Sequence, residues 1–305
     1  MRLSTVGAAR VWRMGDRKLS LDRPLVAGIL NVTPDSFSDG GRFERPRAAI
    51  ARGRQIAADG AAILDVGAES TRPGADPIPA GEEWARLEPV LHGLRDLPIP
   101  ISVDTSKLEV AERAVDAGAA AINDVTALRG DPGLARLAAR TGAGLVLMHM
   151  RGTPRTMQLD TAYGDVALEV RSFLADARRA ALEAGCEPEQ VAVDPGLGFG
   201  KSVEGNLELL ARLDEIASLG APVWVGPSRK SFLGALLDAG SDGRVTGSVA
   251  ACVAAARRGA DVLRVHDVRE TRQALDVEAA IDARRAGGAR ATRPDGRTRA
   301  AGGHS

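Results

Sequence analysis

Polar side chains of the kinds that bind small molecules stand directly after short apolar runs in this sequence of 305 residues. They comprise carboxylates, amides, a lysine and an Arg/His pair: Asp104, Asp194, Asn31, Asn123, Lys230, Arg264 and His266. A single Asp, Asn or Ser at such a place often does no more than cap a helix. Capping does not account for the whole set, because burying these groups together costs free energy unless a polar ligand satisfies them. The set therefore predicts a binding site for a polar ligand.

Arg264 and His266 stand two residues apart at the end of the last apolar run. Alternate side chains of a strand share a direction, so we expect both to point to the same side. An isolated histidine is more often structural than functional, but a guanidinium with the same direction favours a binding role.

Eight β-rich runs lead to these polar residues, and each is followed by a stretch with helical spacing that is rich in Ala, Leu and Arg. The runs are Leu25 to Asn31, Ala62 to Val66, Ile99 to Val103, Ala120 to Asn123, Leu145 to Met148, Val191 to Val193, Val223 to Val225, and Val262 to Val265. Repeated βα units predict parallel strands, and eight of them fit a closed (β/α)8 barrel, the TIM barrel, better than an open sheet. The active site of such a barrel lies at the carboxyl ends of its strands, where the polar set would meet.

We expect the chain to comprise a hairpin extension at 1–22, a single α/β barrel domain at 23–283 and a tail at 284–305. Two β-type runs on either side of Gly15 and Asp16, which favour a turn, predict the hairpin, and it could cover one barrel end. The tail consists mainly of Gly, Ala and Arg without apolar periodicity, so we expect it to be disordered. Contact of its arginines with an anionic partner is the alternative to a solvated tail.

The charge balance excludes a general attraction to nucleic acid or to an anionic membrane, since Lys+Arg and Asp+Glu both number 40. No stretch approaches the roughly 18 apolar residues of a membrane span, and the first residues lack the apolar core of a signal peptide. Cys186 and Cys252 lack the spacing of a metal site or a disulfide framework, so we expect two inert, reduced thiols. These features predict a cytoplasmic location.

Three ordered segments resemble the signature stretches of the dihydropteroate synthases. They are the run from Gly28 to Gly41, which reads GILNVTPDSFSDGG, the run from Asp194 to Lys201, which reads DPGLGFGK, and Ser228-Arg229-Lys230. The similarity extends from about Leu25 to Val268 and includes the run from Met148 to Pro154 and Asn206. The resemblance implies a TIM-barrel transferase of folate biosynthesis that joins 6-hydroxymethyl-7,8-dihydropterin pyrophosphate to 4-aminobenzoate, giving 7,8-dihydropteroate and pyrophosphate. It also implies a homodimer, because family members commonly dimerise.

The edge of a pterin carries ring nitrogens and an amino group, for which a carboxylate that accepts two hydrogen bonds is the natural complement. Asp194 is our candidate, and the resemblance agrees. It further implies that Asp104, Asn123 and Lys230 contact other ring positions; capping of the helix near Ser106 is the alternative for Asp104. Met148 and Phe199 offer apolar faces, and Gly198 stands between Gly196 and Gly200 where a flat ring needs close backbone approach. This glycine loop lacks the spacing of a phosphate-binding loop, so we assign it to the ring.

The resemblance places the diphosphate against Asn31, Thr71, Arg264 and His266. A diphosphate also favours Mg²⁺, a hard cation that takes oxygen ligands and keeps bound water. Asn31 can offer its amide oxygen and is the candidate metal ligand.

The carboxylate of 4-aminobenzoate needs a receptor of its own, and Ser231 precedes an apolar run that predicts a helix whose free amides attract anions. A plain N-cap is the alternative role for Ser231. Two loops rich in Gly, Pro and Ser resemble the family's substrate-ordered loops rather than ordinary connections; they carry Phe37, Asp39, Thr71, Arg72 and Pro73. The catalytic candidates are Asn31, Asp39, Arg72, Lys230, Arg264 and His266.

Two alternatives stay open at this point. A pterin-binding methyltransferase barrel would share the Asp and Asn residues, but it has no evident need for Ser228 to Ser231 with Arg264 and His266. A catalytically silent relative that only binds pterins is the second alternative, since a fold and a pocket do not establish activity.

Overall fold

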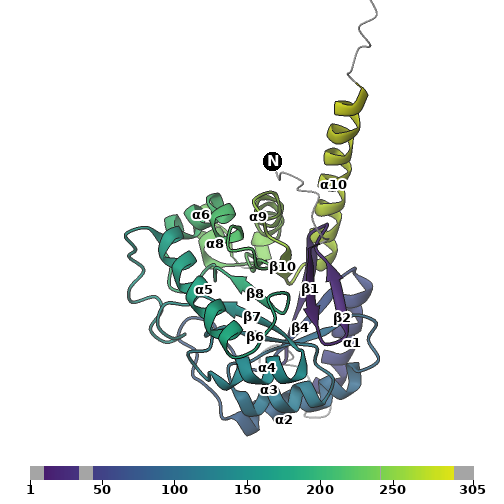
Figure 1. The fold of residues 1–305 in the computed structure, drawn as a ribbon, viewed down its shortest axis with the longest axis vertical. Coiled ribbons are helices and arrows are strands. Elements are labelled where there is room, and N and C mark those ends of the chain that lie inside the picture. Colours follow the sequence, from purple (N-terminus) through teal and green to yellow (C-terminus); the bar gives the residue numbers. More distant parts are fainter. Residues whose placement is uncertain (1–9, 34–43, 241, 292–305) are drawn as a thin grey trace, which may run out of the picture.

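Residues 10–33, 44–240 and 242–291 are described by the structure, a computed structural model. Within them eight parallel strands follow one another in the order β8-β7-β6-β5-β4-β3-β10-β9. A parallel bridge between Val193 and Val223 joins the two outer strands, so the sheet closes on itself. Helices surround the sheet (Figure 1), and the predicted (β/α)8 barrel is confirmed.

The strands follow the predicted runs to within two residues at either end. They are β3 (Leu25–Asn31), β4 (Ile63–Gly67), β5 (Ile101–Asp104), β6 (Ala121–Asp124), β7 (Gly144–Met148), β8 (Val191–Asp194), β9 (Trp224–Val225) and β10 (Val262–Val265). The helices are α1 (Glu44–Ala58), α2 (Ala80–Leu94), α3 (Leu108–Asp116), α4 (Gly133–Thr141), α5 (Val166–Glu183), α6 (Val203–Ala211), α7 (Leu213–Ala217), α8 (Ser231–Leu237), α9 (Val245–Arg257) and α10 (Val268–Ala291), with a 3₁₀ turn at Asp242–Arg244. None of the described helices is long and apolar enough to cross a membrane.

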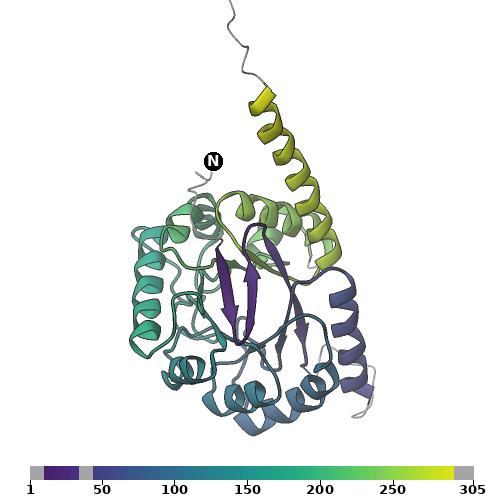
Figure 2. The same ribbon diagram turned by 45° about the vertical axis from the view of Figure 1, so that its right-hand side comes forward.

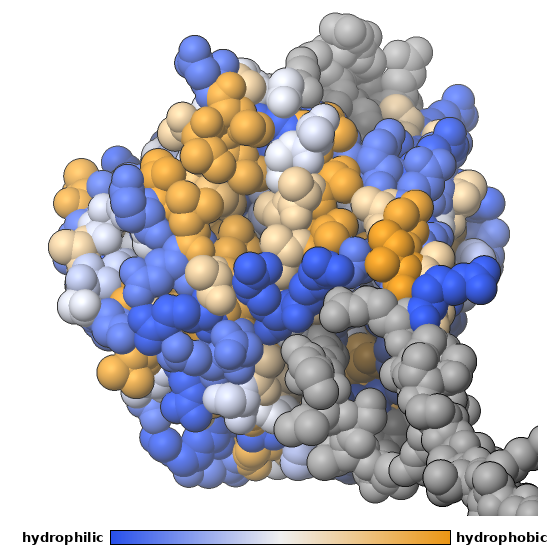
Figure 3. Space-filling view, turned by 90° about the horizontal axis from the view of Figure 1, so that it is seen from above, coloured by the Kyte–Doolittle hydropathy of each residue, from blue (hydrophilic) through white to orange (hydrophobic). Residues whose placement is uncertain are grey.

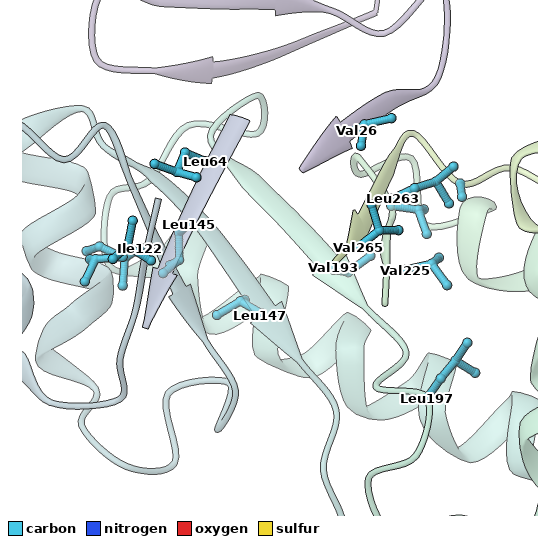
Figure 4. Close-up of a cluster of buried hydrophobic side chains, with 14 of the residues drawn as sticks. Val26, Leu64, Ile122, Leu145, Leu147, Val193, Leu197, Val225, Leu263 and Val265 are labelled. Atoms are coloured by element: carbon cyan, nitrogen blue, oxygen red, sulfur yellow. The ribbon is translucent and has the colours of Figure 1, made fainter. Parts of the chain in front are cut away.

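Side chains alternate along each strand between the helices and the barrel interior. The outward set is aliphatic and packs beneath the helices; Figure 4 shows members of it, among them Val26, Leu64, Ile122, Leu145, Leu147, Val193, Leu263 and Val265. The inward set changes in character along the strands. It begins with a buried apolar layer of Ala27, Ile63, Ala121, Val146, Ala192, Trp224 and Val262. The next inward residues, two positions further, form the polar layer described below.

An antiparallel hairpin of β1 (Val11–Met14) and β2 (Arg17–Ser20) lies across the amino-terminal end of the barrel (Figure 2). Trp12 is fully buried against the apolar layer, its ring 5.2 Å from that of Trp224, and its indole nitrogen donates to the carbonyl of Gln190. The predicted hairpin is therefore confirmed. Because it covers the amino-terminal end, the carboxyl ends of the strands are left as the barrel's opening for a ligand.

The last helix extends further than the sequence pattern predicts. We expected ordered structure to end near Arg284, but α10 continues to Ala291. Ala and Arg favour a helix intrinsically, and this segment needs no apolar face to continue one already formed. Residues 292–305, the rest of the expected tail, lie outside the described residues.

Candidate active site

A layer of polar side chains lies directly above the apolar layer, at the carboxyl ends of the strands. Its residues follow the apolar layer by two positions on their strands: the polar Asp65, Asn123, Asp194 and Arg264, with the apolar Met148 at the same level of β7. All of them except Asp65 line a central cavity, together with Asp104, Lys230, Phe199, His266, Ser228 and Thr71. The structure thus brings together most of the residues that the sequence singled out.

Asp194, the last residue of β8, is 5% exposed, and its Oδ1 accepts a hydrogen bond of 2.7 Å from the backbone nitrogen of Gly196. Burial raises the pKa of Asp194 to about 6, while the Gly196 hydrogen bond and the nearby Lys230 oppose the rise. A carboxylate with this environment gains from a ligand that supplies further hydrogen-bond donors.

Arg264 lies across the barrel interior and joins two carboxylates. Its Nε donates to Asp65 at 2.6 Å and its Nη2 to Asp104 at 2.7 Å. Asn123 donates to the same Asp65 oxygen at 3.3 Å, and Asp65 is fully buried. Sequence reasoning gave Asp65 no role, although a carboxylate inside an apolar β run is the signal that could have found it. Asp65 fixes the guanidinium in the layer.

Asp104 does not cap a helix, which was the alternative for it. The helix that follows, α3, begins at Leu108, and its N-cap residue Lys107 makes no side-chain capping bond. The Asp104 carboxylate pairs with Arg264 instead. Burial raises the pKa of Asp104, the Arg264 charge opposes this, and Asp65 adds to the rise.

Lys230 places its ammonium 3.9 Å from the ring centroid of Phe199, in a cation–π contact. Burial and then the charge of Arg264 lower the pKa of Lys230 to about 8, against the attraction of Asp194 and Asp104. A Cβ on Gly198, whose φ is +80°, would stand 3.0 Å from Cδ of Lys230. Gly198 therefore allows the Lys230 side chain to pass close to the backbone and reach the ring.

The glycine loop, residues 195–200, also packs closely against the chain itself. A Cβ on Gly196 would stand 1.9 Å from the carbonyl oxygen of His149. Lys201, which sequence reasoning left without a role, is 4% exposed and donates to the carbonyls of Gly196 at 2.8 Å and Phe199 at 2.9 Å. The glycine at 196 is thus required by the protein's own backbone, and Lys201 fixes the loop from beneath.

His266 contacts Ser228 through its Nδ1 at 3.1 Å, and the Ser228 oxygen accepts from the backbone nitrogen of His266 at 3.2 Å. Burial and the Arg264 charge lower the pKa of His266 to about 4. His266 is therefore neutral near pH 7. It can bind an anion through a ring N–H but not by charge.

Arg229, between Ser228 and Lys230, forms a two-bond ion pair with Asp267, at 2.6 and 3.0 Å. It has a left-handed backbone with φ of +55°, and its nitrogen donates to Ser248. Strain of this kind persists where the surroundings fix the chain, and the next residue, Lys230, lines the cavity.

Other predicted residues lie at the rim rather than in the layer. Asn31 is half-buried at the end of β3, two residues beyond the cavity-lining Ile29. Thr71 lines the cavity, whereas Arg72 and Pro73 are exposed. Ser231 is exposed as the first residue of α8; Lys230 is the N-cap, so the plain N-cap role proposed as an alternative for Ser231 is not observed. Phe37 and Asp39 lie outside the described residues.

Comparison with known proteins agrees with this geometry. Residues 27–266 match the family model described as pterin binding enzyme. The dihydropteroate synthase of Neisseria meningitidis serogroup B is 44% identical over 280 residues, which cover 90% of this chain and 98% of the relative.

Two solved structures extend the likeness to the fold. Dihydropteroate synthase of Xanthomonas albilineans with 4-aminobenzoic acid has a TM-score of 0.85 at 47% identity, covering 90% of this chain and 99% of the other. The Thermus thermophilus enzyme in complex with 6HMPPP has a TM-score of 0.78 at 47% identity, covering 89% and 99%. These matches favour a synthase over the methyltransferase alternative. The chain belongs to the dihydropteroate synthases of the pterin-binding enzyme family.

Proposed function

We propose that the chain condenses 6-hydroxymethyl-7,8-dihydropterin pyrophosphate with 4-aminobenzoate, and that its polar layer binds the pterin end of the first substrate. The observation that carries this assignment is the buried Asp194 carboxylate at the carboxyl end of β8, inside a cavity whose other polar groups face it. A carboxylate accepts two hydrogen bonds from the amino group and the ring nitrogen of a pterin. No other ligand class is needed to explain the layer.

The remaining pterin contacts follow from the same cavity. Asn123 and Asp104 supply hydrogen bonds to further ring positions, and Lys230 donates to the carbonyl and ring-nitrogen side. Met148 and Phe199 belong to a small apolar cluster that suits the flat faces of the ring. Gly198 has no side chain, which leaves room for Lys230 beside the loop.

The diphosphate is assigned to Arg264, His266, Asn31 and Thr71. Nε and Nη2 of Arg264 already donate to Asp65 and Asp104. Its remaining N–H groups would therefore donate to the phosphate oxygens. His266 contributes a neutral N–H donor. The carboxylates on the inner side keep the guanidinium oriented, which lowers the cost of binding an anion on the outer side.

The donors at the end of β3 fit Mg²⁺ held mainly by the substrate. Among the described residues there is no group of three or more His, Cys, Asp or Glu that could hold a metal. Mg²⁺ with phosphates typically takes only one or two protein oxygens and keeps several waters. Asn31 can supply one amide oxygen. Bound Mg²⁺ would offset the negative charge on the departing pyrophosphate.

The 4-aminobenzoate subsite is assigned to the rim. Ser231 and the backbone at the start of α8 are the candidates for its carboxylate, and Thr71, Arg72, Pro73 and Phe37 for enclosing its ring. Arg72 is exposed and so is able to turn toward a carboxylate. In the sequence, Phe37 and Asp39 follow β3, and Thr71, Arg72 and Pro73 follow β4.

In the proposed reaction the arylamine nitrogen attacks the pterin methylene carbon, the carbon–oxygen bond to the diphosphate breaks, and the nitrogen loses a proton to water. Arg264 and His266 stabilise the leaving pyrophosphate while positive charge develops on the methylene. An arylamine is neutral near pH 7, so orientation of the two substrates matters more than a general base. Lys230, Arg72 and Asp39 act by positioning the substrates.

We also propose a cytoplasmic homodimer. Large apolar side chains are exposed on neighbouring helices, namely Leu207 of α6 and Leu236 and Leu237 of α8. Figure 3, which views the end of the molecule where these helices lie, includes patches of apolar surface. Contiguous exposed apolar surface favours association with another protein surface. Sedimentation at several concentrations should therefore give twice the mass of one chain.

The pH profile tests the role of Asp194. Because its pKa is raised to about 6, the carboxylate becomes protonated as the pH falls through 6 and loses one of its two acceptor positions. We expect kcat/KM for the pterin substrate to be constant between about pH 6 and the pKa of Lys230, about 8, and to fall about tenfold per unit below pH 6. A profile measured from pH 5 to 8 that stays flat would contradict the assignment. The matched Asp194→Asn enzyme should lack this acid limb.

A further inference from the structure

One lysine joins both ends of the loop between β4 and α2, residues 68–79. Nζ of Lys107 contacts Glu69, at the start of this β4–α2 loop, and Oε2 of Glu83, in the first turn of α2, at 2.5 Å. Lys107 itself follows β5, and its backbone nitrogen donates to Thr105 at 3.2 Å. A single ammonium thus connects the segment that follows β5 to both ends of the β4–α2 loop.

The three charges are sheltered from water. The side chain of Glu83 is fully buried, and those of Lys107 and Glu69 are 24% and 20% exposed. Burial raises the pKa of Glu83, which Lys107 opposes; burial also lowers the pKa of Lys107, but the two carboxylates raise it more. Ion pairs removed from water are weakened little by salt, and losing one partner leaves the others uncompensated.

The middle of the β4–α2 loop has little packing beneath it. A side cavity of about 360 Å³ separates the loop from the β7–α5 segment; Glu69 and Thr71 of the loop and Glu83 of α2 line it on this side. Across it the loop makes a backbone hydrogen bond from Gly74 to Pro154 and an exposed ion pair between Asp76 and Arg155. A loop that packs little against the rest of the protein is held in place mainly by the contacts at its two ends.

We propose that Lys107 is a positioning residue for the reaction: by pairing with Glu69 and Glu83 it sets where the β4–α2 loop presents Thr71 and Arg72 to the substrates. The inference rests on the substrate role proposed for those two residues. This role explains why Lys107, Glu69 and Glu83 are sheltered from water beside the side cavity, although none of them lines the central cavity. Displacement of the loop by 1 Å is enough to cost about a hundredfold in rate, so a small shift at its ends has a large effect.

The test compares Lys107→Met and Glu69→Gln with Arg212→Met. Arg212 is a matched control, because it joins Asp165, Glu208 and Glu215 on the outer helices, away from the cavity. Steady-state kinetics and amide hydrogen exchange over residues 70–79 are measured on each purified full-length enzyme. Glu69→Gln keeps the Lys107–Glu83 pair and so tests the idea even where Lys107→Met folds poorly. Lys107→Arg, which keeps the charge, serves as the conservative variant.

We expect KM for 4-aminobenzoate to rise at least about tenfold in Lys107→Met and Glu69→Gln, with faster exchange confined to the loop. The kinetic constants of Arg212→Met should stay at wild-type values, and so should the hydrogen exchange of β5 in every variant. Lys107→Arg should recover part of the loss. Unchanged KM in both loop variants overturns the inference, whether or not exchange rises. Arg72→Ala separates the two proposals: if it lowers turnover while the Lys107 and Glu69 variants do not, only the inference fails, and if it too is silent, the loop has no substrate role.

Discussion

Replacing Asp194 with Asn is expected to lower kcat/KM for the dihydropterin pyrophosphate on the order of 10³-fold. Asn has nearly the shape of Asp, but it presents one acceptor and an NH₂ donor where the carboxylate presents two acceptors. The donor would face the donors of the pterin edge. Both sides are then left with unmade hydrogen bonds in a buried site, which is the most costly way to lose a polar contact.

The stability of Asp194→Asn should move in the opposite sense from its activity. The pKa of Asp194 is raised above its ordinary value, so at pH 7 the ionised carboxylate opposes folding and the neutral amide does not. We therefore expect the Tm at pH 7 to hold or rise. Asp261→Asn is the matched control: Asp261 is equally buried at the other end of the barrel, where it pairs with Arg10 and accepts from Val223. That variant should lose stability and keep its KM for the pterin substrate.

Replacing Arg264 with Met is expected to reduce both turnover and stability. The guanidinium is the shared partner of Asp65 and Asp104, and its loss leaves carboxylates inside the barrel without a cation. Removing one member of a buried ion pair typically costs about 3–5 kcal/mol in the free energy of unfolding. Diphosphate binding loses its main cation at the same time, so kcat/KM should fall together with stability. Arg264→Ala should show the same loss of activity.

A second substitution separates the two effects of Arg264→Met. Adding Asp65→Asn removes one of the unpaired charges, so we expect the double variant to regain part of the stability in urea unfolding and none of the activity. Recovery of both would mean that Arg264 serves only the fold. Wild-type kinetics in purified Arg264→Met would refute its assignment to the diphosphate.

The period-two pattern of the strands made the polar layer predictable from the sequence. Asn123, Asp194 and Arg264 each stand at or near the end of an apolar run, and a barrel brings the ends of all such runs to one rim whatever their separation in sequence. The hairpin was predictable for a local reason, the turn at Gly15 and Asp16. The hairpin and the polar layer thus follow from short stretches of sequence and from the rule that a barrel gathers the ends of its strands at one rim.

The sequence did not show which carboxylate pairs with which cation. Arg264 meets Asp65 only because β10 lies beside β3 and the barrel then curves. Lys107 meets Glu69 and Glu83 only because the β4–α2 unit and the segment after β5 lie side by side in the barrel. Several carboxylates were equally available to each cation in the sequence. Sequence reasoning accordingly assigned Arg264 to the diphosphate alone and passed over Asp65, Lys201 and Lys107.

Pyrophosphate release by the purified enzyme tests the central claim most directly. Supplied with the dihydropterin pyrophosphate, 4-aminobenzoate and Mg²⁺, the enzyme should release one pyrophosphate for each 7,8-dihydropteroate formed. Release should require both substrates, because the arylamine is the nucleophile that displaces the diphosphate. Absence of release with both substrates present, in either order of addition, would contradict the account and favour a protein that binds pterins without turning them over.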